Sequence, residues 1–328
     1  MFRLQRQTIK DSSILVVGGA GFIGSHLVDK LISIGASQVL VLDSLFIGKE
    51  INLSHALTHG ATLLVDDAEN PEALAYIMEK QKIDIVFNCA TKPLNYSFIN
   101  PSNAFMTNVQ VLKNLLELQR KDAFKTLCHF SSSEAYGTAQ YEPMDEGHPL
   151  LPTTTYAAGK AAADLMLQSY VKMFDLDAFI VRPFNNYGPR QNFEGALAGV
   201  IPLTIKKILQ GEPPEIHGDG KQTRDFIYVK DTVNIVTKLF PIISSGECVN
   251  ITTDQQTSIA NVVKTIVEVM DYKGNVLRKP ARIADVLNHR GSDKRLQDLI
   301  GSYPKTAFKD GIGHTVDWVR DAAFSHDR

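Results

Sequence analysis

Four residues near the middle of the chain have the types and spacing of an acid–base site. Tyr156 and Lys160 stand four apart in YAAGK, so a helix would place both side chains on one face. A lysine ammonium beside a phenol favours phenolate and would lower the pKa of Tyr156 from its ordinary value of about 10. Such a phenolate can take a proton from a substrate hydroxyl while a hydride leaves the same carbon. Upstream, FSSSEAYG supplies Ser132, which would hydrogen-bond the reacting oxygen, and the carboxylate of Glu134.

A glycine-rich turn predicts the group that receives the hydride. In ILVVGGAGFIGSHLVDKL a G-x-x-G-x-x-G pattern, made by Gly18, Gly21 and Gly24, connects a strand-like run to a helix-like run, and such a turn lets the backbone approach a pyrophosphate. About 20 residues later QVLVLD ends in Asp43, whose carboxylate would bond ribose hydroxyls and repel a 2′-phosphate. We therefore predict NAD as the cofactor. The residues predicted to bind it are Gly18, Gly21, Phe22, Ile23, Gly24, Asp43, Asp67, Ala68, Ala90, Tyr156 and Lys160.

Strand-like and helix-like runs alternate through the first half of the chain. QVLVLD, DIVFNCA and AFIVRPFN alternate with helical segments such as PEALAYIMEKQK and YAAGKAAADLMLQSYVKMF. This order predicts βαβ units and a parallel sheet covered on both faces. The predicted fold class is α/β, a Rossmann doubly wound parallel sheet with a smaller, mixed α/β C-terminal substrate lobe. We expect residues 1–183 and about 225–251 in the cofactor domain, and about 184–224 and 252–328 in the lobe.

The composition is that of an ordinary globular enzyme. With 34 Lys and Arg against 36 Asp and Glu, the formal net charge is −2, without the basic excess of a nucleic-acid-binding protein. Since no apolar run has the length of a membrane span or of a signal peptide's core, we expect no membrane association and a cytoplasmic protein. Cys89, Cys128 and Cys248 are widely spaced, and no cluster has metal-ligand spacing, so we predict no disulfide framework and no metal.

Five motifs occur along the chain in an order typical of one family. They are GGAGFIG, SSSEAYG, YAAGK, PFNNYGPR and GDGKQTRDF. With them the chain resembles the extended short-chain dehydrogenase/reductases, and within these the NAD-dependent nucleotide-sugar epimerase/dehydratase branch. The resemblance implies bound NAD, a nucleotide-sugar substrate, and a homodimer built from the helices near 105–120 and 157–173. It also implies that Ser132, Tyr156 and Lys160 form the catalytic triad. The residues expected to contact the substrate are Ser133, Asn185, Val200, and the two arginines that suit phosphate, Arg224 and Arg282.

Glu134 distinguishes among the reactions of this branch. It stands two places after Ser132, where the resemblance to 4,6-dehydratases implies a base for the sugar's C5 proton, which becomes acidic once C4 is a ketone. Ser133 stands where the dTDP-glucose dehydratases carry an aspartic acid, and Ser-Glu also resembles GDP-mannose dehydratases and the decarboxylases that make UDP-xylose. ATKPL, PFNNYGPRQN and the AGVIP segment look most similar to soluble UDP-GlcNAc 4,6-dehydratases.

The leading hypothesis is therefore a lyase that converts UDP-GlcNAc to UDP-4-keto-6-deoxy-GlcNAc. One alternative is a 4-epimerase of UDP-glucose, UDP-GlcNAc or UDP-glucuronate, in which Glu134 only bonds the sugar. A UDP-glucuronate decarboxylase is another, and it needs a cation for the C6 carboxylate, which Lys92 or an arginine not yet placed would offer. The sequence leaves open whether Lys92 meets the sugar or only solvent. A NAD-binding relative without catalysis is disfavoured because the triad is intact.

Overall fold

Short runs of branched and aromatic residues form the central sheet of the protein. The computed structural model describes residues 6–281 and 287–324, and its principal strands are β1 (Ser13–Val17), β2 (Gln38–Asp43), β3 (Thr62–Val65), β4 (Ile85–Asn88), β5 (Thr126–Phe130), β6 (Asp177–Pro183) and β11 (Cys248–Ile251). They pair in parallel in the order β11-β6-β5-β4-β1-β2-β3. The predicted fold class is confirmed. Because the strand order reverses between β1 and β4, the crevice beyond these strands is where such a sheet binds a ligand.

The sheet strands are apolar on both faces because both faces are covered. In β1, Ile14 and Val16 belong to one core, whereas Leu15 and Val17 belong to the other, and none of the four is more than 1% exposed. This explains why these strands have continuous apolar runs and lack the polar alternation of a half-exposed sheet.

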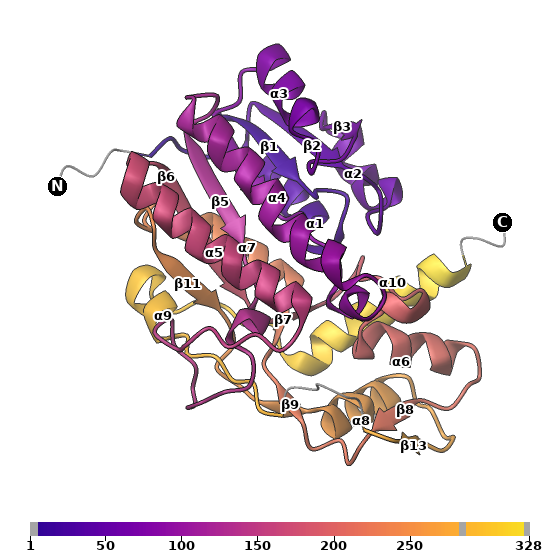
Figure 1. Ribbon diagram of the computed structural model, residues 1–328. Coiled ribbons are helices and arrows are strands. Elements are labelled where there is room, and N and C mark those ends of the chain that lie inside the picture. The colour runs from indigo at the N-terminus through magenta and orange to yellow at the C-terminus, as the bar shows by residue number, and fades with distance from the viewer. Residues whose placement is uncertain (1–5, 282–286, 325–328) are drawn as a thin grey trace.

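Five helices provide most of the cover. They are α1 (Phe22–Ile34), α3 (Pro71–Lys80), α4 (Pro101–Arg120), α5 (Thr155–Phe174) and α7 (Val229–Leu239). Helices α1 and α7 contribute to one core and α3, α4 and α5 to the other, with α4 and α5 side by side across the front of Figure 1. Side chains mark where the two front helices begin: Asn100 accepts from the Asn103 amide at 3.1 Å, and Thr154 accepts from the Ala157 amide at 3.2 Å.

A smaller lobe lies at the carboxyl ends of the strands (Figure 1). Its core joins α6 (Val200–Leu209), α8 (Ile259–Val269) and α10 (Phe308–Phe324) around the rings of Tyr187 and Tyr228. Paired short strands complete it, and these are β7 (Asn185–Tyr187) with β10 (Phe226–Tyr228), β9 (Thr223–Arg224) with β12 (Thr257–Ser258), and β8 (Glu215–His217) with β13 (Leu277–Lys279).

The remaining described elements are short. They are the 3₁₀ turns η1 (Glu50–Leu53), η2 (Leu94–Phe98), η3 (Ser133–Tyr136) and η4 (Gly195–Leu197), and the helices α2 (Ser54–Thr58) and α9 (Lys294–Ile300). The expected domain division stays a prediction. Strand β11 joins the central sheet, but Leu296 of α9, assigned to the lobe, also packs in a core of that sheet.

A glycine sets the distance between α4 and α5. A Cβ on Gly159 would lie 2.6 Å from the carbonyl oxygen of Phe105 and 3.0 Å from its Cα. Both obstructing atoms belong to the α4 backbone, so they cannot move aside as a flexible side chain would. Gly159 therefore allows α5, with Tyr156 and Lys160, to lie against α4.

We expect Gly159→Ala to lower the free energy of unfolding by about 1–3 kcal/mol, the usual cost of overpacking. Urea denaturation would measure it. Gly313→Ala in α10 is the matched control, because a Cβ there would have no neighbour within 4 Å. That substitution should raise stability by up to about 1 kcal/mol through helix propensity alone. Equal stabilities for the two variants would contradict the close approach.

Candidate active site

The residues predicted to bind the cofactor surround one cavity of about 320 Å³ at the carboxyl ends of the strands. Those that line it are Gly18, Gly21, Phe22, Ile23, Gly24, Asp43, Asp67, Ala68 and Ala90. Tyr156 and Lys160 instead line a second cavity of about 150 Å³. The two cavities share Phe22, Ile23, Cys89 and Thr91 as wall residues, so the dinucleotide region adjoins the catalytic residues.

The glycine turn has the shape that a pyrophosphate needs. Gly18 has a φ of +77°, and a Cβ there would lie 2.7 Å from the Cα of Ala90. A Cβ on Gly24 would lie 2.3 Å from the carbonyl oxygen of Gly18. Helix α1 begins directly after Gly21, and no side chain caps it. Its first amide groups are therefore available to an anion in the cavity.

Asp43 is held at the rim of the cavity by the backbone around it. Its carboxylate accepts hydrogen bonds from the Ala20 amide at 2.9 Å and the Leu45 amide at 2.8 Å. Burial raises the pKa of Asp43, while these amides and the charge of Lys92 act in the opposite direction. A carboxylate fixed in this way, lining a cavity beside a glycine turn, suits the hydroxyls of an adenosine ribose. The residues thus fit NAD.

Lys92 also belongs to the cofactor cavity. Its side chain is 10% exposed, and its ammonium lies 3.8 Å from Glu69 Oε1 and 4.1 Å from the centre of the Phe46 ring. The same Glu69 oxygen accepts a hydrogen bond from the Thr107 hydroxyl at 2.7 Å. The sequence left open whether Lys92 contacts the sugar or only solvent. The structure instead places its ammonium on the cavity wall, where its positive charge acts on Asp43.

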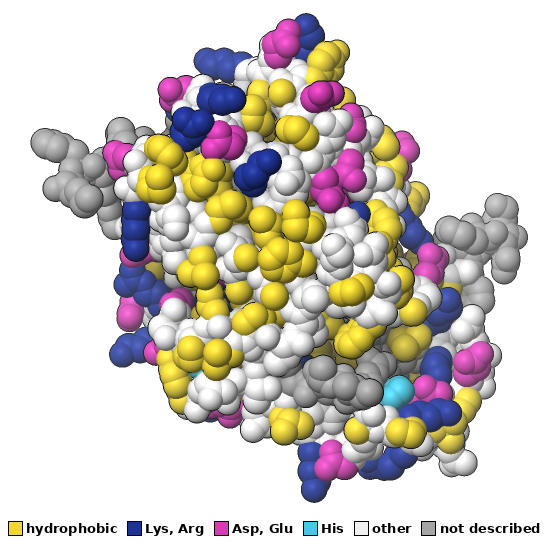
Figure 2. All heavy atoms as spheres, viewed as in Figure 1, with side chains coloured by type: hydrophobic (Ala, Val, Ile, Leu, Met, Phe, Trp, Pro, Cys, Tyr) yellow, Lys and Arg dark blue, Asp and Glu magenta, His cyan; other side chains and the backbone are white. Residues whose placement is uncertain are grey.

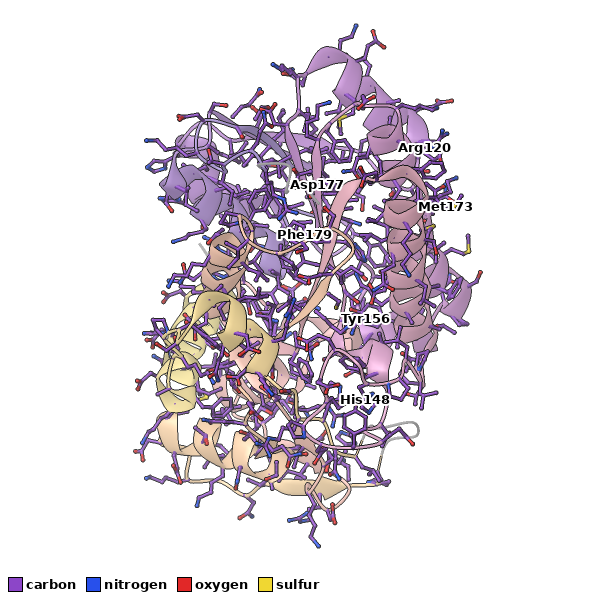
Figure 3. All side chains as sticks on the ribbon, turned by 90° about the vertical axis from the view of Figure 1, so that its left-hand side faces the viewer. Arg120, His148, Tyr156, Met173, Asp177 and Phe179 are labelled. Carbon is purple, nitrogen blue, oxygen red and sulfur yellow. The ribbon has the colours of Figure 1, made fainter. Side chains whose placement is uncertain are left out.

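The second cavity brings three of the predicted catalytic residues together, Ser132, Tyr156 and Lys160. Ser132, at the end of β5, caps the turn η3 by accepting a hydrogen bond from the Glu134 amide at 3.2 Å. The phenol of Tyr156 hydrogen-bonds with the side chains of Ser132 and Thr91. The ammonium of Lys160 donates to the carbonyl oxygen of Phe130 at 2.8 Å, so α5 is fastened directly to β5. Figure 3 shows Tyr156 at the end of α5 nearer the lobe.

The expectation that Lys160 lowers the phenol pKa is wrong for this arrangement. Burial raises the pKa of Tyr156 to about 12, against hydrogen bonds with Ser132 and Thr91 that lower it. Burial also lowers the pKa of Lys160 to about 8, while the charge of Asp164 opposes the change. Desolvation therefore outweighs the attraction between neighbouring groups. In this arrangement burial therefore favours the neutral phenol of Tyr156 over the phenolate.

Glu134 lies half-buried on η3, on the same turn as Ser132. Its negative charge acts on Tyr156 and helps to raise the pKa of the phenol. The carboxylate is therefore within electrostatic reach of the catalytic hydroxyl, although it does not line either cavity. Ser133, by contrast, is 2% exposed and also lies outside both cavities, so its predicted contact with substrate stays a prediction.

Three of the residues predicted to hold the substrate, Ser133, Asn185 and Arg224, lie near a histidine that the sequence did not indicate. His289 is fully buried, with Nε2 3.2 Å from the carbonyl oxygen of Ser133 and Nδ1 3.4 Å from the side-chain nitrogen of Asn185. Arg224 lies close enough for its charge to lower the pKa of His289. Val200 begins α6 beside the lobe core. Arg282 lies outside the described residues.

Two other wall residues were missed. Thr91 follows the NCA stretch at the carboxyl end of β4, a position where parallel sheets place ligand contacts, so its place in the chain was a usable signal. Trp318 lines the cofactor cavity with its ring 5.7 Å from that of Phe193, and its spacing in a terminal helix offered no such signal. Among the described residues no cluster could hold a metal ion, and no helix is long and apolar enough to cross a membrane.

The chain matches the family model described as NAD-dependent epimerase/dehydratase over residues 14–252. It belongs to that family. Family membership confirms the expected cofactor, NAD. It also shows that the protein is an enzyme of the nucleotide-sugar epimerase, dehydratase and decarboxylase group, all three of which occur among its relatives.

Three curated relatives represent these reactions. The UDP-glucose 4-epimerase of Mycolicibacterium smegmatis is 32% identical over 94% of this chain and 98% of its own. The dTDP-glucose 4,6-dehydratase of Xanthomonas campestris is 32% identical over 93% of this chain and 92% of its own. The UDP-glucuronic acid decarboxylase 1 of Xenopus tropicalis is 31% identical over 94% of this chain and 72% of its own. Overall identity therefore does not separate the three reactions.

Similarity to solved structures does not separate the epimerase from the dehydratase reaction either. The UDP-glucose 4-epimerase of Thermotoga maritima, solved with UDP-glucose, has a TM-score of 0.89 at 31% identity and covers 95% of this chain and 99% of its own. The dTDP-glucose 4,6-dehydratase of Streptomyces venezuelae, solved with NAD, has a TM-score of 0.88 at 28% identity, covering 94% of this chain and 97% of its own. The fold is common to both reactions, so the site must distinguish them.

We expect Lys92→Gln to raise the Kd of NAD about tenfold, since a charge-assisted hydrogen bond contributes about 1.5–3 kcal/mol and 1.4 kcal/mol is tenfold in affinity. Trp318, the single tryptophan of the chain, lines this cavity, so quenching of its fluorescence would report binding. The exposed Lys82, changed to Gln, is the matched control and should leave the Kd unchanged. An unaltered Kd in Lys92→Gln would show that the ammonium does not meet the cofactor.

Proposed function

We propose that the protein is a nucleotide-sugar 4,6-dehydratase. The observation that carries this proposal is the position of Glu134 on the turn that Ser132 caps, with its charge acting on Tyr156. Oxidation at C4 alone needs one proton acceptor, whereas loss of water across C5 and C6 needs a second group at C5. Glu134 offers that second group from the same turn as the triad serine.

In this mechanism each of these side chains has one role in the proton transfers. Tyr156, once deprotonated, takes the proton of the C4 hydroxyl, Ser132 hydrogen-bonds the same oxygen, and Lys160 adds positive charge. NAD, when bound, supplies the hydride acceptor for C4 and the hydride that C6 receives. Glu134 takes the C5 proton from the 4-ketone and passes it to the hydroxyl that leaves C6 as water. C5 later regains a proton, which balances the one that Tyr156 took.

We infer that the substrate is UDP-linked, with UDP-GlcNAc the first choice. The Thermotoga maritima relative was solved with UDP-glucose, and the Mycolicibacterium smegmatis relative is a UDP-glucose enzyme. Asn185 and Arg224 would take the diphosphate, since amide and guanidinium N–H groups suit phosphate oxygens. The acetamido sugar is favoured by the resemblance of PFNNYGPRQN and AGVIP to UDP-GlcNAc dehydratases.

A UDP-sugar 4-epimerase is the second candidate function. Two of the relatives, from Mycolicibacterium smegmatis and Thermotoga maritima, are UDP-glucose 4-epimerases. In that reaction Glu134 would only hydrogen-bond the sugar. A UDP-glucuronate decarboxylase has less support, because Lys92, one candidate cation for its carboxylate, lies on the wall of the cofactor cavity.

Mass spectrometry of the products tests the proposal directly. The purified protein with NAD would be incubated separately with UDP-GlcNAc, UDP-glucose, UDP-glucuronate, dTDP-glucose and GDP-mannose. Loss of one water from UDP-GlcNAc is the expected result. Unchanged mass with a new stereoisomer would establish the epimerase, and loss of carbon dioxide from UDP-glucuronate would establish the decarboxylase.

Glu134→Gln should lower the rate of water loss by about 10²–10⁴-fold, the usual contribution of a positioned acid–base group. C4 oxidation, followed as the absorbance of reduced cofactor in a single turnover, should persist because Tyr156 is intact. Tyr156→Phe is the matched variant and should suppress both signals. Normal dehydration by Glu134→Gln would remove this residue from the mechanism.

We also infer a homodimer formed through α4 and α5. Figure 2 shows hydrophobic side chains gathered over these helices, and the exposed ones there include Met106, Leu165, Met173 and Phe174. In Figure 3 Met173 lies on the outer side of α5. Apolar side chains that are 41–69% exposed on two adjacent helices favour burial against a second copy.

Leu165→Glu should therefore convert a dimer to a monomer in light scattering coupled to gel filtration, because it places a charge in the apolar contact. Tyr76→Glu on α3, where the side chain is 63% exposed, is the control and should leave the mass unchanged. A wild-type protein with the mass of one chain would overturn the inference.

A further inference from the structure

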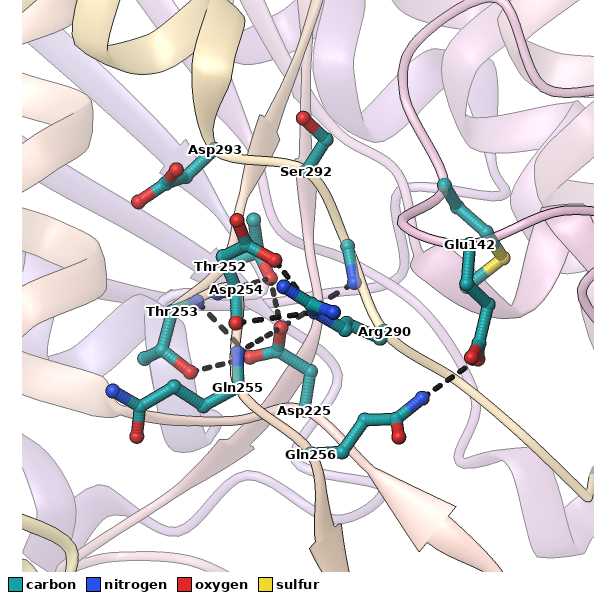
Figure 4. Close-up of polar contacts among 12 residues, drawn as sticks. Glu142, Asp225, Thr252, Thr253, Asp254, Gln255, Gln256, Arg290, Ser292 and Asp293 are labelled. Atoms are coloured by element: carbon teal, nitrogen blue, oxygen red, sulfur yellow. Dashed lines mark hydrogen bonds and ion pairs between the residues drawn. The ribbon is translucent and has the colours of Figure 1, made fainter.

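A fully buried carboxylate joins three segments of the lobe. Asp225, between β9 and β10, is 0% exposed and accepts from the Thr253 hydroxyl at 2.6 Å and the Thr253 amide at 3.0 Å. It also accepts from the amides of Gln255 and Gly291, each at 3.3 Å, and from the Thr252 hydroxyl (Figure 4). A buried carboxylate is tolerated only when its oxygens are bonded in this way, so the three segments keep one relative position.

The third of these segments, residues 287–291, is held at further points. The Arg290 guanidinium pairs with Asp254 at 2.7 Å, and the Arg290 carbonyl accepts from the Met144 amide at 2.8 Å. A Cβ on Gly291 would lie 2.5 Å from the ring of Phe184. Close packing and hydrogen bonds on several sides therefore fix the backbone on which His289 is carried.

The hydrogen bonds of His289 determine its tautomer. The Ser133 carbonyl can only accept, so Nε2 carries the proton and donates to it at 3.2 Å. Nδ1 is then an acceptor, and it receives an N–H of the Asn185 amide at 3.4 Å. Burial and the charges of Arg224 and His148 lower the pKa of His289 to about 3, which keeps the ring neutral.

We propose that His289 is a positioning residue that couples recognition of the diphosphate to the acid–base turn. Its ring spans from the Asn185 amide, on the diphosphate side, to the backbone of η3, where Ser132 and Glu134 stand. The orientation of Asn185 and the position of the turn therefore depend on one imidazole. The inference rests on the proposed function, because it takes Asn185 as a diphosphate contact.

His289→Phe tests the coupling, since it retains a ring beside Phe184 and removes both hydrogen bonds. We expect the Kd of UDP, measured by calorimetry, to rise about tenfold, which corresponds to 1.4 kcal/mol. We expect kcat for the sugar that the product panel identifies to fall about tenfold as well. His289→Gln can donate to Ser133 and accept from Asn185 through its amide, so it should recover most of both losses. The exposed His59, changed to Phe, should leave both values at wild type.

A double-mutant cycle with Asn185→Ala separates coupling from a general loss of structure. If His289 acts through Asn185, His289→Phe should no longer weaken UDP binding once Asn185 is alanine, while its effect on kcat should remain. Additive losses of UDP affinity would overturn the proposal, as would UDP binding and kcat within twofold of wild type in His289→Phe. A wild-type protein that binds no UDP, dTDP or GDP would overturn the proposed function together with this inference. Normal UDP binding by wild type and His289→Phe alike would overturn the inference alone.

Discussion

The attachment of α5 to the end of β5 is the constraint on which the rest of the site depends. Lys160 donates to the Phe130 carbonyl at 2.8 Å, and Ser131 donates to Asp164, one turn further along α5, at 2.6 Å. Asp164 in turn pairs with Arg182 of β6 at 2.8 Å. These groups are almost entirely buried, and breaking a buried ion pair is expensive, so the helix cannot shift along the sheet. Tyr156 is thereby kept against Ser132.

Burial around this attachment also sets the electrostatics of the site. Tyr156 and Lys160 are both buried. Desolvation raises the pKa of the phenol and lowers that of the ammonium, so in each case it favours the neutral form. A phenol and an amine in this condition respond strongly to any charge that enters the adjoining cavities, because screening there is weak.

On the other side of the site, one buried carboxylate holds the segments of the lobe together. Asp225 joins the strand that carries Arg224, the loop after β11 and the segment that carries His289. Neither the Rossmann sheet nor the lobe alone contains a whole site: Ser132 and Tyr156 belong to the first, and Arg224 and His289 to the second. The contact of His289 with the Ser133 carbonyl oxygen on η3, at 3.2 Å, joins the two parts.

Local patterns allowed much of this to be predicted from the sequence. Each of the motifs GGAGFIG, Asp43 and YAAGK lies within one or two neighbouring secondary-structure elements. Their positions relative to the sheet follow from the alternation of strands and helices. The family to which the chain belongs also followed from these motifs. The specific reaction did not, because the relatives share the motifs and differ in what surrounds the sugar.

The sequence by itself determined the fold class and the cofactor, since these depend on short-range spacing and on the geometry common to all parallel sheets, and it predicted residues that line one cavity. Tertiary structure alone decided the pKa directions of Tyr156 and Lys160, the place of Lys92 on the wall of that cavity, and the contacts of His289. His289 lies 156 residues from Ser133 and 104 from Asn185 along the chain, and no spacing rule connects them. Burial and contacts between distant segments arise only when the whole chain has packed, and these are the quantities on which desolvation and long-range hydrogen bonds depend.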